Sequence, residues 1–288
     1  MIKPMLAQLE PKPFNDPRYL WETKYDGIRA IITGGVTGKY TIQARSGSDK
    51  TLLFPELALK SKRACILDGE LVSTTGKFNG IQHRANRING IAQAIRNYPV
   101  RYEVFDIIEA DGIDLRRVPL IKRKEILQEL LIPTDTVKVA GFVEDGETLF
   151  EAMVSNGYEG VVGKLKAGTY QEGKRNWLKV KCTQMGEFLI CGYTPGTGWR
   201  ASTFGALVLG RQDENKLTYV GSVGTGFNDA EITDLYYLLL GSRVDRCPFP
   251  IPPPEAAAWV KPEITIKVRF LEYTDDSRLR FPAYKGRD

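Results

Sequence analysis

The chain has 288 residues, of which 42% are apolar and 26% are charged, and this ordinary globular composition excludes a disordered, collagen-like or coiled-coil protein. No apolar run reaches the roughly 18 residues of a membrane span, and the length predicts about two domains. The net charge of +5 is unevenly distributed along the chain. Residues 1–184 carry 28 Lys and Arg against 22 Asp and Glu, whereas residues 185–288 carry 12 Lys and Arg against 13 Asp and Glu. We therefore expect phosphate-binding residues in the first part.

Short strand patterns separated by turns dominate residues 1–184. Helical patterns lie between them, and Pro119 and Gly157 stand where two of these helices would begin and end. Because strands outnumber helices and do not alternate with them, we predict a mixed α+β domain of antiparallel sheets rather than a doubly wound sheet. The expected strands are 20–24, 28–33, 41–45, 65–72, 102–108, 137–143, 160–165 and 176–181, and the expected helices are 55–62, 81–97, 120–131 and 147–156.

After residue 184 the pattern changes to strands and turns, with expected strands at 188–194, 205–211, 216–223 and 264–273. One helix, 229–240, interrupts them, with Asn228 or Asp229 as its N-cap. A few strands and one helix in roughly a hundred residues are typical of a small Greek-key barrel such as the OB-fold. The proline-rich residues 248–254 are expected to be an extended connection. We therefore predict two domains, residues 1–184 and an all-β OB-fold domain of residues 185–288.

Several classes of site are excluded. The four cysteines show neither C-x-x-C pairing nor the density of a disulfide scaffold. The single histidine, His83, excludes sites that need two imidazoles, and we expect it to be solvated or to cap a helix. Residues 221–226 are glycine-rich but lack the Lys-Ser/Thr pair of a P-loop, and no Rossmann motif follows a strand. The N-terminus lacks the pattern of a signal peptide, so a cytoplasmic protein is expected.

The first candidate catalytic residue is Lys24, in the sequence Lys24-Tyr-Asp-Gly-Ile-Arg29. A strand ends there in an Asp-Gly turn, which would expose the amine. Taken alone, this is also the pattern of an ordinary hairpin with a surface lysine. Two further expected strands are apolar except for charged residues. The strand period of two places Asp68 and Glu70 on one face of the first of these strands. In the same way, Lys179 and Lys181 share one face of another strand.

Glu159 and Lys164 bracket four small or apolar residues, and buried charges of this kind need partners. Carboxylates, lysines and arginines gathered on the strands of one domain suit a magnesium-bound triphosphate, because Mg²⁺ takes few carboxylates and completes its shell with phosphate and water. The alternative is a set of surface ion pairs, each worth little.

The ordered motifs resemble those of the ATP-dependent DNA ligases, a family of nucleotidyltransferases. In the first domain they are Lys24-x-Asp-Gly-x-Arg29, Asp68-Gly-Glu70, Tyr102-Glu-Val-Phe-Asp106, Glu159-Gly-Val-Val-Gly-Lys164 and Lys179-Val-Lys181. Residues 205–210, 220–227 and 278–282 resemble the OB domain of the same family. The resemblance spans nearly the whole chain and is greatest to the compact ligase module of bacterial end-joining repair proteins.

The sequence departs from this family at two points. Gly163 stands where relatives often have a larger residue. The C-terminal part lacks the Arg-x-Asp-Lys ending of larger ligases, so Asp275 and Lys285 are further candidates beside Arg278 and Arg280.

The resemblance implies that Lys24 attacks the α-phosphate of ATP, expels pyrophosphate and holds AMP as a phosphoramidate. For this Lys24 must lose its proton, which Lys179, Lys181 and magnesium favour, and the same two lysines would neutralise charge on the α-phosphate. The resemblance further implies that Glu22 meets the adenine amino group and that Phe105 stacks on the adenine, although Phe105 alone would also suit an ordinary core aromatic.

The remaining roles also follow from the resemblance. Arg29 and Glu70 would address the ribose, Arg45 would reach the AMP phosphate, and Arg280 of the OB domain would be presented to ATP by a domain movement. Glu70 and Glu159 would hold Mg²⁺, with Mn²⁺ as an alternative.

We therefore expect a monomeric DNA ligase that passes AMP to the 5′-phosphate of a break and then joins it to the 3′-hydroxyl. Its substrate would be nicked duplex DNA, bound through phosphates without sequence preference. We expect the N-terminal DNA-binding domain of larger relatives to be absent, so a DNA end-binding repair protein is an expected partner. The alternatives are an RNA ligase, an mRNA capping guanylyltransferase and, in another class, a non-catalytic DNA-binding module; an NAD-dependent ligase is less favoured.

Overall fold

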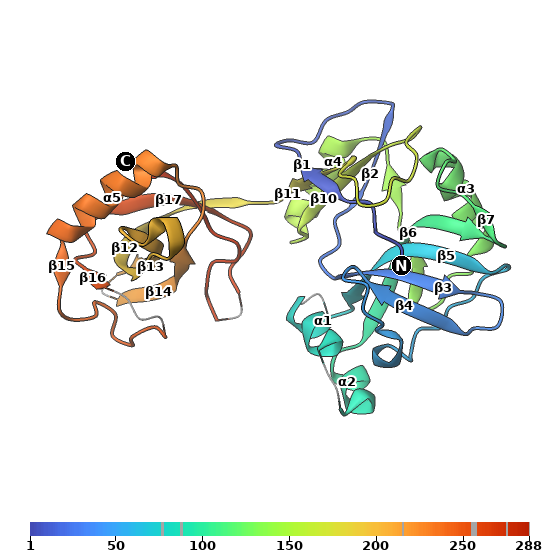
Figure 1. Ribbon diagram of the computed structural model, residues 1–288, viewed down its shortest axis with the longest axis horizontal. Helices are drawn as coiled ribbons and strands as arrows, with labels where there is room; N and C mark the ends of the chain where they lie inside the picture. Colours follow the sequence, from blue (N-terminus) through green and yellow to red (C-terminus); the bar gives the residue numbers. More distant parts are fainter. Residues whose placement is uncertain (76–77, 87–88, 215, 255–257, 275, 288) are drawn as a thin grey trace. The chain divides into compact units, whose positions relative to one another are not determined.

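The computed structural model describes residues 1–75, 78–86, 89–214, 216–254, 258–274 and 276–287 (Figure 1). The chain divides into two compact units, which we call unit 1 (Met1–Cys182) and unit 2 (Thr183–Asp288). Each unit has its own hydrophobic core. No helix in the described part of the chain has both the length and the apolar character needed to cross a bilayer.

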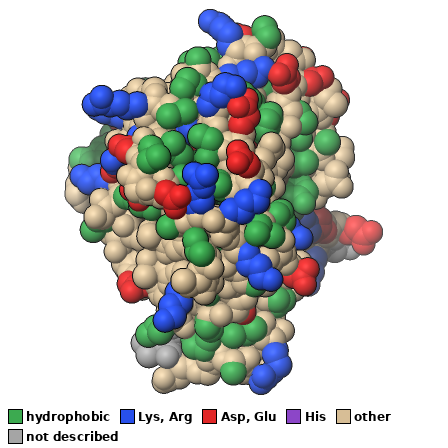
Figure 2. Space-filling model, turned by 90° about the vertical axis from the view of Figure 1, so that its right-hand side faces the viewer, with side chains coloured by type: hydrophobic (Ala, Val, Ile, Leu, Met, Phe, Trp, Pro, Cys, Tyr) green, Lys and Arg blue, Asp and Glu red, His purple; other side chains and the backbone are tan. Residues whose placement is uncertain are grey.

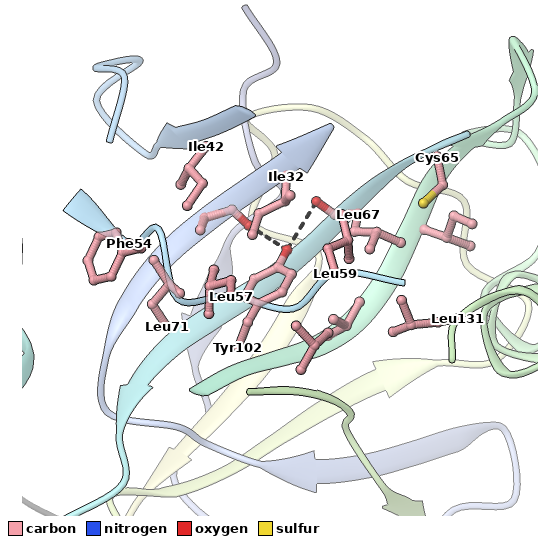
Figure 3. Packing of buried hydrophobic residues seen from close by; sticks show 14 of the residues in the cluster. Ile32, Ile42, Phe54, Leu57, Leu59, Cys65, Leu67, Leu71, Tyr102 and Leu131 are labelled. Atoms are coloured by element: carbon pink, nitrogen blue, oxygen red, sulfur yellow. Dashed lines mark hydrogen bonds between the residues drawn. The ribbon is translucent and has the colours of Figure 1, made fainter. Parts of the chain in front are cut away.

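The first sheet of unit 1 has the strand order β4-β3-β5-β6-β7, and β8 joins it along β6. All its pairings are antiparallel except that of β8 with β6. Figure 3 shows Tyr102 in the core behind this sheet, with its hydroxyl 3.0 Å from the carbonyl oxygen of Ala30 and 3.2 Å from that of Leu67. The buried hydroxyl is thus satisfied by backbone. The strands are β3 (Ile28–Gly34), β4 (Tyr40–Ala44), β5 (Cys65–Ser73), β6 (Val100–Ala110), β7 (Ile113–Asp114) and β8 (Val137–Val139).

The second sheet of unit 1 has the order β1-β11-β10-β2-β9. β1 runs parallel to β11, which brings the N-terminal segment beside the strand that carries Lys179 and Lys181. Helix α4 packs on β10 and β2 of this sheet, and α3 packs on β6 of the first sheet. The strands are β1 (Ala7–Leu9), β2 (Tyr19–Thr23), β9 (Phe142–Val143), β10 (Gly160–Leu165) and β11 (Trp177–Lys181), and the helices of unit 1 are η1 (Thr51–Leu53), α1 (Phe78–Ala85), α2 (Ile91–Asn97), α3 (Leu120–Leu130) and α4 (Gly146–Ser155).

Unit 2 consists of strands around one long strand, β12, with a single α-helix, α5, among its described residues. One edge of β12 pairs with β13, and the other pairs first with β17 and then with β16. Asn228 caps α5 through a capping box with Glu231. The elements are β12 (Gln184–Pro195), η2 (Gly198–Arg200), β13 (Phe204–Asp213), β14 (Lys216–Val223), α5 (Asp229–Gly241), β15 (Arg243–Val244), β16 (Ala258–Val260), β17 (Thr265–Phe270) and β18 (Ala283–Arg287). The predicted α+β class, with a sheet-rich first part followed by a β-rich second part, is confirmed.

The predicted helix 55–62 is wrong. Leu57 and Leu59 are buried while their neighbours face solvent, which is the period of an extended segment. The segment lies beside the C-terminal end of α3, where the Lys62 N–H donates to the Leu130 carbonyl at 3.0 Å. The alternation Leu-Ala-Leu-Lys therefore indicated an extended chain.

Two other predicted elements are divided. The helix 81–97 is two helices, α1 and α2; α2 begins after Gly90, whose φ of 72° is left-handed, and residues 87–88 lie outside the described part. The strand 137–143 is likewise two strands, because β8 belongs to the first sheet and β9 to the second. His83 is exposed and its ring stacks on Tyr98 at 5.2 Å.

Candidate active site

A pocket of about 200 Å³ lies within unit 1 and is lined by residues from both of its sheets. Basic and acidic side chains alternate on the face of the protein shown in Figure 2. In the pocket, by contrast, cations predominate among the charged groups. Seven of the predicted site residues line it: Glu22, Lys24, Arg29, Arg45, Glu70, Phe105 and Lys179.

Strand register explains how Lys24 meets its neighbours. Lys24 follows the last residue of β2, and its N–H donates to the carbonyl of Gly160, the first residue of β10, at 2.9 Å. Glu159 therefore lies beside Lys24, and the Lys24 ammonium donates to Glu159 Oε2. Gly160 pairs with Lys181 of β11, whose Nζ lies 2.9 Å from Glu159 Oε1. We call these three charged residues, Glu159, Lys24 and Lys181, the Glu159 cluster.

Gly160 is required for this geometry. Its φ is +144°, and a Cβ at this position would lie 2.0 Å from the Val180 carbonyl oxygen. Gly163, three residues along the same strand, faces the indole of Trp21, and a Cβ there would approach that ring to 2.8 Å. The space that a larger side chain would need at residue 163 is thus filled by Trp21.

Burial and neighbouring charges shift the pKa values of three groups near Lys24. Burial acts to raise the pKa of Glu159, but the Lys24 and Lys181 ammonium groups outweigh it and hold that pKa below its ordinary value. Burial and then the neighbouring cations lower the pKa of Lys179. Burial raises the pKa of Glu70 to about 8, against the opposing effects of Arg29 and Lys24. The Lys24 nitrogen is engaged with Glu159 in this structure, so that contact must open before the nitrogen can attack a phosphorus atom.

Arg29 is fixed by a fork of hydrogen bonds. Its Nε and Nη2 lie 2.5 and 2.6 Å from the two carboxylate oxygens of Asp68, which also accepts from Tyr170 at 2.6 Å. Arg29 Nη2 further donates to the Met5 carbonyl at 3.1 Å. The guanidinium is thereby held 4.6 Å from the ring centre of Phe105. Asp68 thus positions an arginine in the wall of the pocket.

An aromatic wall faces these cations. Phe105 packs edge to face against Trp177, with 5.8 Å between the ring centres. Lys164 Nζ lies 4.2 Å from the centre of each ring. The cation is within the range of attraction by both ring faces. Trp177 was missed as a site residue, although its alternation with Lys179 on β11 is a signal that could have found it.

Glu22 lines the pocket and is only 2% exposed. It pairs with Val162 of β10, so that Lys164, two residues farther along β10, reaches the same face. Lys164 Nζ donates to Glu22 Oε2 at 2.7 Å, and Lys124 Nζ of α3 lies 2.5 Å from Oε1. We call Glu22, Lys124 and Lys164 the Glu22 cluster. Lys124 was missed, because a lysine within a charged helix carries no sign that it is buried.

The other predicted residues lie elsewhere. Glu159 and Lys181 do not line the pocket but contact Lys24 and each other, as described above. Arg280 belongs to unit 2, where it pairs with Glu272 at 2.6 Å. Asp275 lies outside the described residues. Residues that line the pocket but were not predicted as site residues are Leu6, Ala7, Thr23, Tyr25, Val162, Lys164, Arg175 and Trp177.

Comparison with protein families gives two matches that together cover most of the chain. Residues 4–181 match the model described as "ATP dependent DNA ligase domain". Residues 200–288 match the one described as "ATP dependent DNA ligase C terminal region". The first match alone covers more than half of the chain.

Similar proteins include the "Multifunctional non-homologous end joining protein LigD" of Mycolicibacterium smegmatis, which is 34% identical over 298 residues covering 98% of this chain. The "DNA ligase" of Ignicoccus hospitalis is 31% identical over 92% of this chain. The chain spans only 38% and 49% of the length of these two relatives. Among solved structures, the ligase domain of M. tuberculosis LigD is 27% identical with a TM-score of 0.56, and the alignment covers 100% of this chain and 95% of that one.

Proposed function

The chain belongs to the family of ATP-dependent DNA ligases, and we propose that it seals breaks in duplex DNA that carry a 5′-phosphate and a 3′-hydroxyl. The observation that carries this proposal is the lysine at the end of β2, which lines a cation-rich pocket and contacts Glu159. Covalent nucleotide transfer needs a lysine amine beside groups that can neutralise a phosphate. The Glu159 cluster and Lys179 supply both.

In the first step Lys24 Nζ attacks the α-phosphorus of ATP. A nitrogen–phosphorus bond forms, the bond between the α-phosphorus and the pyrophosphate oxygen breaks, and the proton released by Nζ passes to water. Glu159 is the carboxylate in contact with that ammonium, so its release from Lys24 frees the nucleophile. Lys179 and Lys181 stabilise the charge that develops on the phosphate oxygens.

The remaining pocket residues hold the nucleotide. Phe105, which lines the pocket, stacks on the adenine, and Glu22 accepts a hydrogen bond from the adenine amino group. Arg29 and Glu70, which are strand partners on β3 and β5, address the ribose. Arg45, which follows β4, binds the AMP phosphate.

In the second step an oxygen of the DNA 5′-phosphate attacks the phosphorus of lysyl-AMP, and the bond to Lys24 breaks. In the third step the 3′-hydroxyl attacks the 5′-phosphorus and AMP leaves, which closes the backbone. Arg280 of unit 2 serves the nucleotide during the first step.

The residues present fit a magnesium ion. Glu70 and Glu159 both lie within electrostatic range of Lys24, and Mg²⁺ commonly takes one or two carboxylates and completes its shell with phosphate and water. Among the described residues, no group of three or more His, Cys, Asp or Glu side chains is placed to hold a metal ion. When bound, the ion would neutralise phosphate charge, and Mn²⁺ could substitute.

The substrate in this proposal is nicked duplex DNA, bound by a monomer through its phosphates. Relatives named for non-homologous end joining support break repair as the setting. We propose a DNA end-binding repair protein as the partner. Sealing that weakens steeply with salt is expected, because phosphate contacts release counterions.

The test is the mass of the intact protein after incubation with magnesium and ATP, GTP or NAD. We expect a gain of one AMP from ATP alone, and no gain in Lys24→Ala. The same proteins are then given nicked DNA and nicked RNA duplexes. Sealing of DNA by the wild type supports the proposal. Sealing by Lys24→Ala, transfer of GMP or sealing of RNA alone would each contradict it.

A further inference from the structure

A closed network of hydrogen bonds beside the pocket joins four residues that are distant in the sequence. The Arg29 guanidinium donates to both carboxylate oxygens of Asp68, at 2.5 and 2.6 Å, and also to the Met5 carbonyl at 3.1 Å. The Tyr170 hydroxyl donates to Asp68 Oδ2 at 2.6 Å and accepts from the Met5 N–H at 3.1 Å. We call Arg29, Asp68, Tyr170 and Met5 the Arg29 network.

Arg29 is the member of this network that lines the pocket. The other three residues are buried, with exposed fractions of 3% for Met5, 0% for Asp68 and 4% for Tyr170. The four residues come from β3, from β5, from the segment between β10 and β11, and from the N-terminal segment ahead of β1. Three buried residues from distant segments therefore fix one arginine of the pocket.

We propose that Tyr170 is a positioning residue, which holds the Arg29 guanidinium ready for the ribose of the nucleotide through Asp68 and Met5. This inference rests on the proposed function, in which Arg29 addresses the ribose of ATP. It assigns a role to Tyr170 and Met5, neither of which lines the pocket.

The Tyr170 hydroxyl is the group that closes the network. Burial and the Asp68 charge raise the pKa of Tyr170, so the hydroxyl keeps its proton and donates it to Asp68. The same oxygen accepts from the Met5 N–H, while the Met5 carbonyl accepts from Arg29. Hydrogen bonds that are linked in this way and that involve charged groups strengthen one another. Loss of the hydroxyl should therefore weaken both of the contacts that hold Arg29.

Fixing Arg29 in advance should favour nucleotide binding. Arginine has a long side chain with many rotamers, and ordering it when a ligand arrives costs conformational entropy. A guanidinium that is already held avoids that cost, which tightens binding. Without the Tyr170 hydroxyl, the buried N–H of Met5 would lose its acceptor and Asp68 would lose one donor. We then expect Arg29 to adopt other orientations, in which it does not meet the ribose.

The alternative is that Tyr170 serves only the hydrophobic core. Its ring packs edge to face on Trp177, with 6.2 Å between the ring centres, and the Arg123 guanidinium lies 5.8 Å from the ring centre. Tyr170→Phe keeps the ring and removes only the hydroxyl. A role in packing alone predicts that this variant binds all adenine nucleotides equally less well. The positioning role predicts a loss confined to nucleotides that carry ribose hydroxyls.

The experiment measures the dissociation constants of ATP and of 2′,3′-dideoxy-ATP, which lacks both ribose hydroxyls, by isothermal titration calorimetry. Each protein carries Lys24→Ala, so that no nucleotide can be attached. We expect this background protein to bind ATP more tightly than the dideoxy nucleotide. Tyr170→Phe should weaken ATP binding by about tenfold but dideoxy-ATP binding by less than about twofold, so that the ratio of the two constants moves toward one.

Tyr40→Phe is the matched control. It also removes a hydroxyl that is hydrogen-bonded to the backbone of unit 1, in this case to the Phe54 carbonyl at 2.7 Å. Tyr40 lies on β4 and does not line the pocket. The ratio of the two dissociation constants should equal that of the background protein.

A second variant, which lacks residues 2–4, tests the network from its other end. The deletion removes the hydrogen bonds that hold the N-terminal segment to Gln43 and Glu172, but it removes no member of the Arg29 network. With Met5 less firmly held, the preference for ATP over dideoxy-ATP should fall here as well. This variant decides the question if circular dichroism shows that Tyr170→Phe does not fold.

An unchanged ratio in the folded variants would overturn the inference, as would equal weakening of both nucleotides. Equal affinity of the background protein for the two nucleotides, or affinity for neither, would overturn it too. Binding in the Lys24→Ala background is independent of nucleotide transfer. A failure of the proposed ligase function would instead be seen as wild-type protein that gains no AMP.

Discussion

The Glu159 cluster and the Glu22 cluster have the same composition, one glutamate between two lysines, but they differ in burial. In the Glu159 cluster the lysine side chains are 19% and 29% exposed. In the Glu22 cluster no side chain is more than 2% exposed. The two clusters are neighbours in the fold, because Glu22 and Lys164 lie on the paired strands β2 and β10, whereas Lys24 directly follows β2 and Glu159 directly precedes β10.

The difference shows that burial, and not composition, decides what such a group of charges can do. Partly exposed ions can exchange partners with water or with a phosphate at little cost. Ions removed from water are held together, because each would be strongly unfavourable alone. The open cluster is therefore suited to chemistry in which Lys24 changes its protonation and its bonds. The closed cluster is suited to holding a fixed arrangement of charges in the wall of the pocket.

The largest expected effect is on the open cluster and concerns chemistry alone. Lys24→Arg keeps a positive charge beside Glu159 but removes an amine that can lose its proton. Formation of the nucleotide adduct should fall by more than about 10³-fold, whereas the free energy of unfolding should change by less than about 1 kcal/mol. Intact mass and urea denaturation measure the two quantities. An active Lys24→Arg protein would show that this lysine is not the nucleophile.

Replacing the central glutamate of each cluster tests the difference between the clusters most directly. Glu22→Ala leaves two buried ammonium groups without a counter-charge and should cost about 3–5 kcal/mol of unfolding free energy. Glu159→Ala leaves lysines that can turn to solvent and should cost about 1 kcal/mol. Urea denaturation of both variants at pH 7 tests this difference. Equal losses would mean that burial does not separate the clusters.

Glu70 and Lys164 should contribute opposite pH dependences to the free energy of unfolding. Between pH 4.5 and 8 the folded protein keeps a proton on Glu70 that the unfolded chain has released, so the free energy of unfolding falls as the pH rises. Between pH 8 and 10.5 the unfolded chain keeps a proton that Lys164 has released in the folded protein, so the free energy of unfolding rises.

Variants separate these two contributions. Glu70→Gln should remove the fall below pH 8, and Lys164→Met should remove the rise above it, relative to the wild type in the same urea titrations. If each variant still shows both slopes of the wild type, other groups are responsible for them.

The smallest effect on stability is expected at an exposed ion pair on the surface of α3. Lys122 and Glu125 of α3 lie 2.9 Å apart with side chains 61% and 56% exposed. Lys122→Ala should change the free energy of unfolding by less than about 0.5 kcal/mol, since i,i+3 pairs on helix surfaces contribute little. Thermal denaturation against wild type measures it. A loss comparable to that of Glu22→Ala would contradict the ordering by exposure.

The sequence by itself determined those parts of the site that depend on local chain geometry. The strand period that places Lys179 and Lys181 on one face of β11 is a property of a few consecutive residues, so it could be read without the fold. The hairpin expected at the Asp-Gly pair after Lys24 is wrong, because β2 and β3 belong to different sheets. The sheet-rich first part and the β-rich second part with one helix were also predictable from their patterns. Where patterns were ambiguous, as in residues 55–62, the apolar alternation was mistaken for a helix.

Only the tertiary structure decided which charges lose contact with water and which partners they find. Lys164 meets Glu22 across 142 residues of chain, and Lys124 comes from a helix whose sequence suggests a solvated face. Trp177 and the N-terminal residues Leu6 and Ala7 join the pocket only because β1 pairs with β11. The physical reason is that the state of a charge depends on the water and the ions around it, and these are set by packing between distant segments.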